Sequence, residues 1–241
     1  MAALLRTEKL TKHFRGLVAN EDISFLLDRG EVRCVIGPNG AGKTTFLSMI
    51  SGHVTPTAGR VWFKDRDITH SPVPRRATIG IGRKFQTPSV FEGLSAHDNL
   101  ELASLKRKKS RTDRMRAIDN ILDTIRLREQ RDLPAQFLSH GQRQWLEIGL
   151  LLANEAELLL LDEPTAGMTS EETAATGQLV QHLARDRSLS VIIIEHDINF
   201  IRNLQAPVTV LHLGRKLREG RFEEIADDEH VRQVYLGTGH A

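Results

Sequence analysis

A glycine-rich loop between a short apolar run and an apolar helical segment constrains this chain more than any other feature. The loop fills every position of the pattern G-x-x-x-x-G-K-[ST], with Gly37, Pro38, Asn39, Gly40, Ala41, Gly42, Lys43, Thr44 and Thr45. Its glycines let backbone N–H groups turn inward around phosphates, Lys43 reaches the β- and γ-oxygens, and the Thr44 hydroxyl can ligate Mg²⁺. The helix predicted over 46–50 directs its N-terminal dipole at the same phosphates. The loop therefore predicts a nucleoside triphosphate site, without specifying the class of NTPase.

A second helix start, at 138–142, predicts another anion site. Ser139 and Gln142 have the spacing of a capping box, and an apolar helical face follows them. The N-terminus of this helix offers free N–H groups beside the Ser139 hydroxyl and the small residue Gly141. An ordinary capped amphipathic helix is the alternative interpretation of this segment taken alone.

Two apolar runs end in acidic or titratable residues. The leucines at 158–161 precede Asp162 and Glu163, and the run at 191–194 precedes Glu195 and His196. Asp162 is placed to hold Mg²⁺ through water, and Glu163 to polarise an attacking water. A solvated turn is the alternative for such paired acids taken singly. The carboxyl ends of parallel strands share one sheet edge, so we expect His196 beside the same crevice.

Together these segments resemble the nucleotide-binding subunit of an ABC transporter over nearly the whole chain. The resemblance implies that 37–45 is the Walker A loop, 158–162 the Walker B strand and 138–142 the signature. It implies that Gln86 is the Q-loop glutamine, acting in catalysis and at the metal, and that His196 is the switch histidine. Phe14 falls where the family places the aromatic that stacks on adenine, although an aromatic in an N-terminal strand is more often part of the core. The implied cofactors are ATP and Mg²⁺.

Within that family the chain is most similar to the branched-chain amino acid importers, and among them to the urea-type importer ATPases. The similarity lies in residues 80–91, 140–149, 166–169 and 234–237. It implies uptake of urea or a short-chain amide, with branched-chain amino acids as the alternative and a soluble, non-transport ABC ATPase as a less favoured one. Two residues depart from the common family pattern, His140 in the signature and Thr169 at the D-loop aspartate, where Thr169 and Glu172 still form a capping box.

The implied partners are a second ATPase subunit, expected to be a non-identical paralogue, and two membrane permease subunits. A solute-binding protein would act indirectly through the permease, at the cytoplasmic face of the cell membrane, where this chain would be peripheral. The net charge of +2 over 241 residues argues against a nucleic-acid partner. The basic run at 106–116 is interpreted as a solvated surface, with contact to anionic lipid or an acidic partner as the alternative.

Length and pattern predict a single α/β domain with a P-loop NTPase core, an antiparallel β region and a helical subdomain insertion. The RecA-like core and its antiparallel region are expected over 1–87 and 154–241, and the helical signature subdomain over 88–153. Strands of the antiparallel region are expected within 4–36 and 60–63, and helices over 96–105 and 114–127. A helix after His196, a strand pair over 208–221 and a polar tail should complete the chain. The lone Cys34 is expected to be a buried structural thiol, and the apolar runs are too short to span a bilayer.

Overall fold

A six-stranded sheet forms the centre of the computed structural model, which describes residues 3–84, 90–105 and 110–236. The strand order is β10-β9-β3-β8-β7-β6, and all neighbours pair parallel except β10 with β9. The strands are β3 (Val32–Ile36), β6 (Ile81–Lys84), β7 (Leu158–Asp162), β8 (Ser190–Ile194), β9 (Val208–His212) and β10 (Arg215–Gly220). This arrangement confirms the predicted α/β fold and the strand pair over 208–221.

Both faces of this sheet are covered, which is why its strands consist of continuous apolar runs. On β7, Leu159 and Leu161 belong to one hydrophobic cluster, together with side chains of α5 (His140–Ala153), α6 (Ser170–Arg187) and α7 (Ile198–Leu204). Leu158 and Leu160 belong to the other cluster, together with α1 (Lys43–Ser51) and the antiparallel sheet. Successive side chains of a strand point to opposite faces of the sheet, so the sheet separates two hydrophobic cores.

The second sheet is antiparallel and four-stranded, in the order β2-β1-β4-β5. Its strands are β1 (Leu5–Phe14), β2 (Leu17–Leu27), β4 (Ala58–Phe63) and β5 (Arg66–Asp67). The prediction that 4–36 belongs to this region is wrong for its last strand. Residues 32–36 form β3, which pairs parallel with β8 and β9 because both of its faces are buried in the central sheet.

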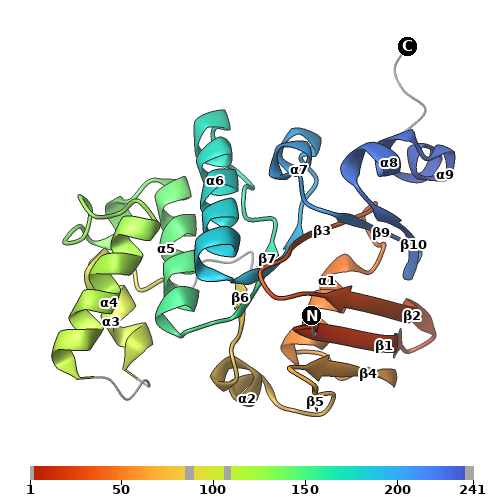
Figure 1. Cartoon of the computed structure of the whole chain (residues 1–241), viewed down its shortest axis with the longest axis horizontal. Coiled ribbons are helices and arrows are strands. Elements are labelled where there is room, and N and C mark those ends of the chain that lie inside the picture. The colour runs from red at the N-terminus through yellow and green to blue at the C-terminus, as the bar shows by residue number, and fades with distance from the viewer. Residues whose placement is uncertain (1–2, 85–89, 106–109, 237–241) are drawn as a thin grey trace.

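Helices on the far side of β6 form a separate lobe, on the left in Figure 1. They are α3 (Ala96–Ser104), α4 (Arg111–Thr124) and α5, with the short 3₁₀ segment Ala135–Phe137 before α5. The helix predicted over 114–127 therefore begins at Arg111, because Ser110 caps it by accepting from the Asp113 backbone N–H. The predicted boundary at 87–88 lies outside the described residues, so the division into core and subdomain stays a prediction.

The described residues after β10 do not form the polar tail that the sequence suggested for this part of the chain. Residues 222–236 form α8 (Phe222–Asp227), α9 (Glu229–Val231) and a π-helical segment, Arg232–Leu236. Phe222, Ile225 and Val231 are buried, so helical spacing of a few apolar residues outweighs the polar composition around them. In the parts of the chain that the structure describes, no helix is both long and apolar enough to cross a membrane.

Candidate active site

Three neighbouring strands of the central sheet, β3, β8 and β7, bring the glycine-rich loop, Glu163 and His196 together. The glycine-rich loop follows β3, Glu163 follows β7, and Glu195 and His196 follow β8. All three strands end at the same sheet edge because they run parallel. A cavity of about 510 Å³ opens there, lined by Phe14, Leu17, Val18, Ala19, Asn39, Gly40, Ala41, Gly42, Lys43, Thr44, Thr45, Glu163 and His196.

The glycine-rich loop is braced by the antiparallel sheet. Gly42 has φ +94°, and a Cβ there would lie 2.4 Å from both the Asn20 Nδ2 and the Ala19 carbonyl oxygen, so only glycine fits. The Lys43 ammonium donates to the carbonyls of Gly37 (2.7 Å) and Pro38 (3.0 Å). Burial lowers the pKa of Lys43, and the nearby carboxylates of Glu163 and Asp162 oppose that shift. The loop therefore holds a cation at its centre, as phosphate binding requires.

Glu163 and His196 lie next to each other in the lining of the cavity. The Glu163 Oε1 lies 3.4 Å from the His196 Nε2, and both side chains are about one-third exposed, at 34% and 38%. The Glu163 backbone has φ 49° and its N–H donates to the Ile194 carbonyl, 2.9 Å away. That bond ties the position of the acid to β8, so the carboxylate and the imidazole reach the same part of the cavity.

Asp162 lies at the buried end of β7 and forms an ion pair that the sequence did not reveal. Its Oδ2 accepts from the Arg83 Nη2 at 3.3 Å, and the Arg83 Nη1 donates to the hydroxyls of Ser48 (2.8 Å) and Ser51 (3.2 Å). The Asp162 Oδ1 is buried, and the described parts of the chain offer it no hydrogen-bond partner. A carboxylate oxygen without a hydrogen-bond partner, close to Lys43 of the glycine-rich loop, suits a hard cation such as Mg²⁺ or its bound water.

Glu195 is a second residue that sequence reasoning overlooked. It is only 4% exposed. Its Oε1 accepts from the Thr165 backbone N–H (3.0 Å), and its Oε2 accepts from the His196 backbone N–H (3.0 Å). This carboxylate therefore joins the backbone after β7 to the backbone after β8. Its position directly after an apolar run was the available signal, but that position equally suits a surface acid.

Phe14 lies at the rim of the cavity with Leu17 and Val18, and its side chain is 43% exposed. The Lys12 ammonium lies 4.9 Å from the centroid of its ring, on one face. Phe14 is therefore not a core residue, which was the alternative to base stacking.

Ser139, Gly141 and Gln142 lie elsewhere, at the N-terminus of α5 in the helical lobe, and none of them lines the cavity. The predicted capping box is present, with the Gln142 N–H donating to the Ser139 hydroxyl (3.1 Å) and the Ser139 N–H donating to the Gln142 side chain (2.9 Å). The His140 side chain contacts the segment after β7, where its Nε2 donates to the Ala166 carbonyl at 2.9 Å. One chain thus holds the two predicted anion sites apart.

Two predicted features lie outside the described residues, Gln86 and the lysines and arginine of 106–109. The structure therefore tests neither the Q-loop assignment nor the basic run.

A larger cavity, of about 620 Å³, lies between α6 and α7. It contains none of the residues that the sequence predicted for the site.

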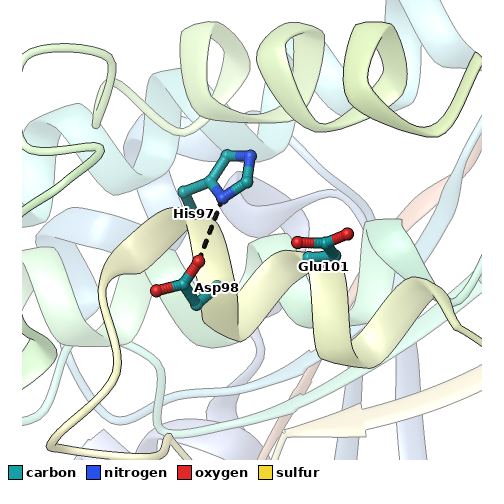
Figure 2. A group of neighbouring side chains, drawn as sticks. All are labelled: His97, Asp98 and Glu101. Atoms are coloured by element: carbon teal, nitrogen blue, oxygen red, sulfur yellow. Dashed lines mark hydrogen bonds and ion pairs between the residues drawn. The ribbon is translucent and has the colours of Figure 1, made fainter. Parts of the chain in front are cut away.

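Figure 2 shows a separate group, His97, Asp98 and Glu101, on α3. The His97 Nδ1 lies 3.2 Å from the Asp98 Oδ1, while the other ring nitrogen of His97 points away from both carboxylates (Figure 2). The backbone N–H of Asp98 donates to the Ser95 hydroxyl at 3.0 Å, and hydrogen bonds from Ser95 and then His97 lower the pKa of Asp98. We attribute this group to N-terminal capping of α3 rather than to metal binding.

Comparison with known proteins places these residues in a family. The family described as "ABC transporter" matches residues 20–166, which include the glycine-rich loop, the α5 start and Glu163. The lipopolysaccharide export system ATP-binding protein LptB of Acidithiobacillus ferridurans is 37% identical, over 98% of this chain and 98% of that protein. The high-affinity branched-chain amino acid transport ATP-binding protein LivG of Salmonella typhimurium is 31% identical, over 97% of this chain and 98% of that protein.

The fold agrees with solved structures of the same family. The ADP conformation of MJ1267, an ATP-binding cassette of an ABC transporter, has a TM-score of 0.90 and 28% identity, covering 98% of this chain and all (100%) of that one. A dimeric, post-hydrolysis structure of the cassette MJ0796 with ADP and Pi has a TM-score of 0.79 and 26% identity, covering 90% of this chain and 98% of that one. Family members bind ATP with Mg²⁺, hydrolyse it to drive transport, and work with membrane permease partners. The chain belongs to the ABC transporter family, as an ATP-binding subunit with ATPase activity.

Proposed function

We propose that this chain is the ATP-binding subunit of an importer for a small polar solute. The observation that carries the hydrolytic part is the single cavity in which Lys43, Glu163 and His196 meet at the ends of adjacent strands. Its rim offers the ring of Phe14 to a base, and its floor offers the loop N–H groups to phosphates.

The residues of the cavity divide the chemistry among them. Lys43 exchanges its bonds with the Gly37 and Pro38 carbonyls for the phosphate oxygens, because both are acceptors and the phosphates carry full charge. Mg²⁺ bound by Thr44 and, through water, by Asp162 would neutralise charge that develops on those oxygens. Glu163 orients and deprotonates the attacking water, while His196 donates toward the γ-phosphate from its Nε2, next to Glu163. Gln86 is proposed to complete the metal site and to report the presence of the γ-phosphate to the helical lobe.

The separation of Ser139 from the cavity supports an arrangement of two chains. In it, the α5 terminus of each subunit closes over the triphosphate held by the other, so that both anion sites contact one nucleotide. We propose that the second subunit is a non-identical paralogue. Two permease subunits would contact the helical lobe, where Phe91, Leu94 and Leu102 are exposed at 58%, 37% and 42%. This chain would then be peripheral on the cytoplasmic face of the cell membrane.

The solute is proposed from the likeness to importers. The resemblance of residues 80–91, 140–149, 166–169 and 234–237 to urea-type importer ATPases supports urea or a short-chain amide. The similarity to LivG supports a branched-chain amino acid as the alternative. Export is a second candidate, because LptB, which belongs to a lipopolysaccharide export system, is more similar to this chain at 37% identity than LivG at 31%. Reconstitution with each candidate permease in vesicles decides between them. Solute accumulating on the side opposite this chain would contradict import.

The hydrolytic mechanism is tested with Glu163→Gln, which keeps the shape of the side chain and removes its basicity. Turnover should fall by about 10²- to 10⁴-fold, the usual contribution of a general base, while ATP affinity is retained. Single-turnover hydrolysis and equilibrium nucleotide binding are measured on the same preparation. Glu129→Gln, at an exposed acid of the helical lobe, is the matched control. Unchanged turnover would remove Glu163 from the role, and lost ATP binding would assign it a structural one.

A further inference from the structure

A carboxylate from another helix occupies the N-terminus of α5. Glu172, in the first turn of α6, accepts through its Oε1 from the Ser139 hydroxyl at 2.9 Å. Its Oε2 accepts from the Thr169 backbone N–H at 3.1 Å, so the acid also completes the capping box of its own helix. The two oxygens of one side chain therefore join the starts of two helices.

The fit at Gly141 shows how closely this carboxylate approaches. A Cβ on Gly141 would lie 2.5 Å from both the Cδ and the Oε1 of Glu172, a distance that real Cβ atoms do not reach. The hydrogen bond from the Thr169 backbone and then that from Ser139 lower the pKa of Glu172, so the group is ionised at neutral pH. An anion thus already sits beside the first-turn N–H groups and the hydroxyl that are expected to receive a phosphate.

We propose that Glu172 is a positioning residue of the α5 anion site: it holds the Ser139 hydroxyl away from phosphate, and closure over the partner's nucleotide requires it to release that hydroxyl. This inference rests on the proposed two-chain arrangement. Two negative groups cannot share one hydroxyl donor and one helix terminus without repulsion. Glu172 therefore sets how much ATP is needed before the subunits close.

The test compares the double variant Glu163→Gln/Glu172→Gln with the single variant Glu163→Gln. Glu163→Gln is present in both so that bound ATP is not hydrolysed. An amide at 172 can still accept from the Thr169 N–H, as Gln142 does at the start of α5, so the fold is retained. Its amide nitrogen can then donate toward a phosphate. The ATP concentration for half-maximal association, followed by light scattering, should fall by about two- to fivefold, the range for one charge at an exposed helix terminus. Glu171→Gln, at the exposed neighbouring acid, should not change it.

A second measurement does not depend on association. Inorganic phosphate should raise the thermal unfolding midpoint of the Glu172→Gln monomer more than that of wild type, and Ser139→Ala should remove the difference. Equal ATP requirements and equal phosphate effects in wild type and Glu172→Gln would overturn the inference while leaving the proposed function intact. Failure of ATP to associate any variant would agree with the non-identical second subunit proposed above, and the phosphate comparison would then decide the role of Glu172.

Discussion

At the scale of a single residue, Phe14 is the side chain that we propose to stack on the base of the nucleotide. Its ring has no hydrogen-bonding atom, so it offers a stacking surface without reading the identity of the base. Phe14→Ala should weaken binding of ATP and of GTP alike, each by about 1–3 kcal/mol, the usual size of a base–aromatic stack. Equilibrium binding of both nucleotides is the measurement. Phe137→Ala is a matched control, because Phe137 is 66% exposed and lies outside the cavity. A strong preference for ATP in wild type, or no loss in Phe14→Ala, would contradict stacking as the main contact.

Cys34 gives a prediction about pH. The thiol is fully buried in β3, and burial, with a smaller effect from Glu195, raises its pKa from 9.0 to about 12. Native protein should therefore not react with a thiol reagent at pH 8, whereas unfolded protein should react at once. The unfolded thiol ionises from about pH 9, whereas the folded thiol ionises only near pH 12. Between these values the folded state therefore keeps the thiol proton that the unfolded state has lost. The free energy of unfolding should fall as the pH rises through this window, by less in Cys34→Ser.

The residue pairs divide into those that spacing reveals and those that it cannot reveal. The capping partners Ser139–Gln142 and Thr169–Glu172 are three positions apart, so the sequence predicted both boxes correctly. Arg83 and Asp162 are separated by 79 positions, and they meet only because β6 and β7 are neighbours in the sheet. The contact of Glu172 with Ser139 likewise depends on how α5 and α6 pack. Contacts set by tertiary packing leave no local pattern to recognise.

At the scale of elements, Arg76 fastens the end of α1, the helix that the glycine-rich loop opens. The guanidinium is 1% exposed and donates to the carbonyls of Met49, Ile50, Thr69 and Ser71 at 2.7–2.9 Å. Two of these carbonyls belong to the last turn of α1, where a cation is favourable. The buried charge is thus satisfied by backbone oxygens, and it holds α1 against the segment before β6.

Arg76→Met should lower the free energy of unfolding by about 3 kcal/mol or more, because it leaves several buried carbonyls without donors. Denaturant unfolding followed by circular dichroism measures the change. Arg75 and Arg76 both belong to α2 (Val73–Thr78), and Arg75 is exposed. Arg75→Met should therefore stay within about 0.5 kcal/mol of wild type. If both variants unfolded at the same denaturant concentration, the guanidinium would not be what secures α1.

Elements were predictable where a long apolar period or a capping signal was present, as for α1, α5 and β7. The sequence misplaced β3 because a buried strand has the same apolar pattern in either sheet, and only its pairing with β8 and β9 decides. It missed α8 and α9 because each is short, and Phe222, Ile225 and Val231 are few apolar residues among many polar ones. Short elements gain their stability from packing rather than from their own propensity.

At the scale of the whole molecule, one chain holds half of each proposed site. The cavity at the sheet edge carries the residues proposed for hydrolysis. The start of α5, in the helical lobe of Figure 1, carries the residues proposed as a second set of phosphate ligands. His140 and Thr169, which depart from the common family pattern, both lie on the side expected to face the partner subunit. The His140 Nε2 donates to the Ala166 carbonyl, and Thr169 caps α6 with a hydroxyl rather than a carboxylate.

This difference leads to the last prediction, that the working unit contains a different second ATPase chain. Thr169 stands where most family members are expected to have an aspartate that faces the partner. A paralogue could supply that missing charge, and the two ATP sites would then be unequal. The isolated chain should therefore associate weakly with itself and hydrolyse ATP slowly, and both should rise when a related ATPase and a permease are added. In that reconstitution, Ser139→Arg in this chain alone should prevent its α5 start from closing over the nucleotide held by the partner. Hydrolysis should then be lost at that one site, while ATP still binds at both. Single-turnover hydrolysis with separately labelled subunits makes the comparison. A tight ATP-dependent homodimer with full activity in the isolated chain would show that no second kind of subunit is needed.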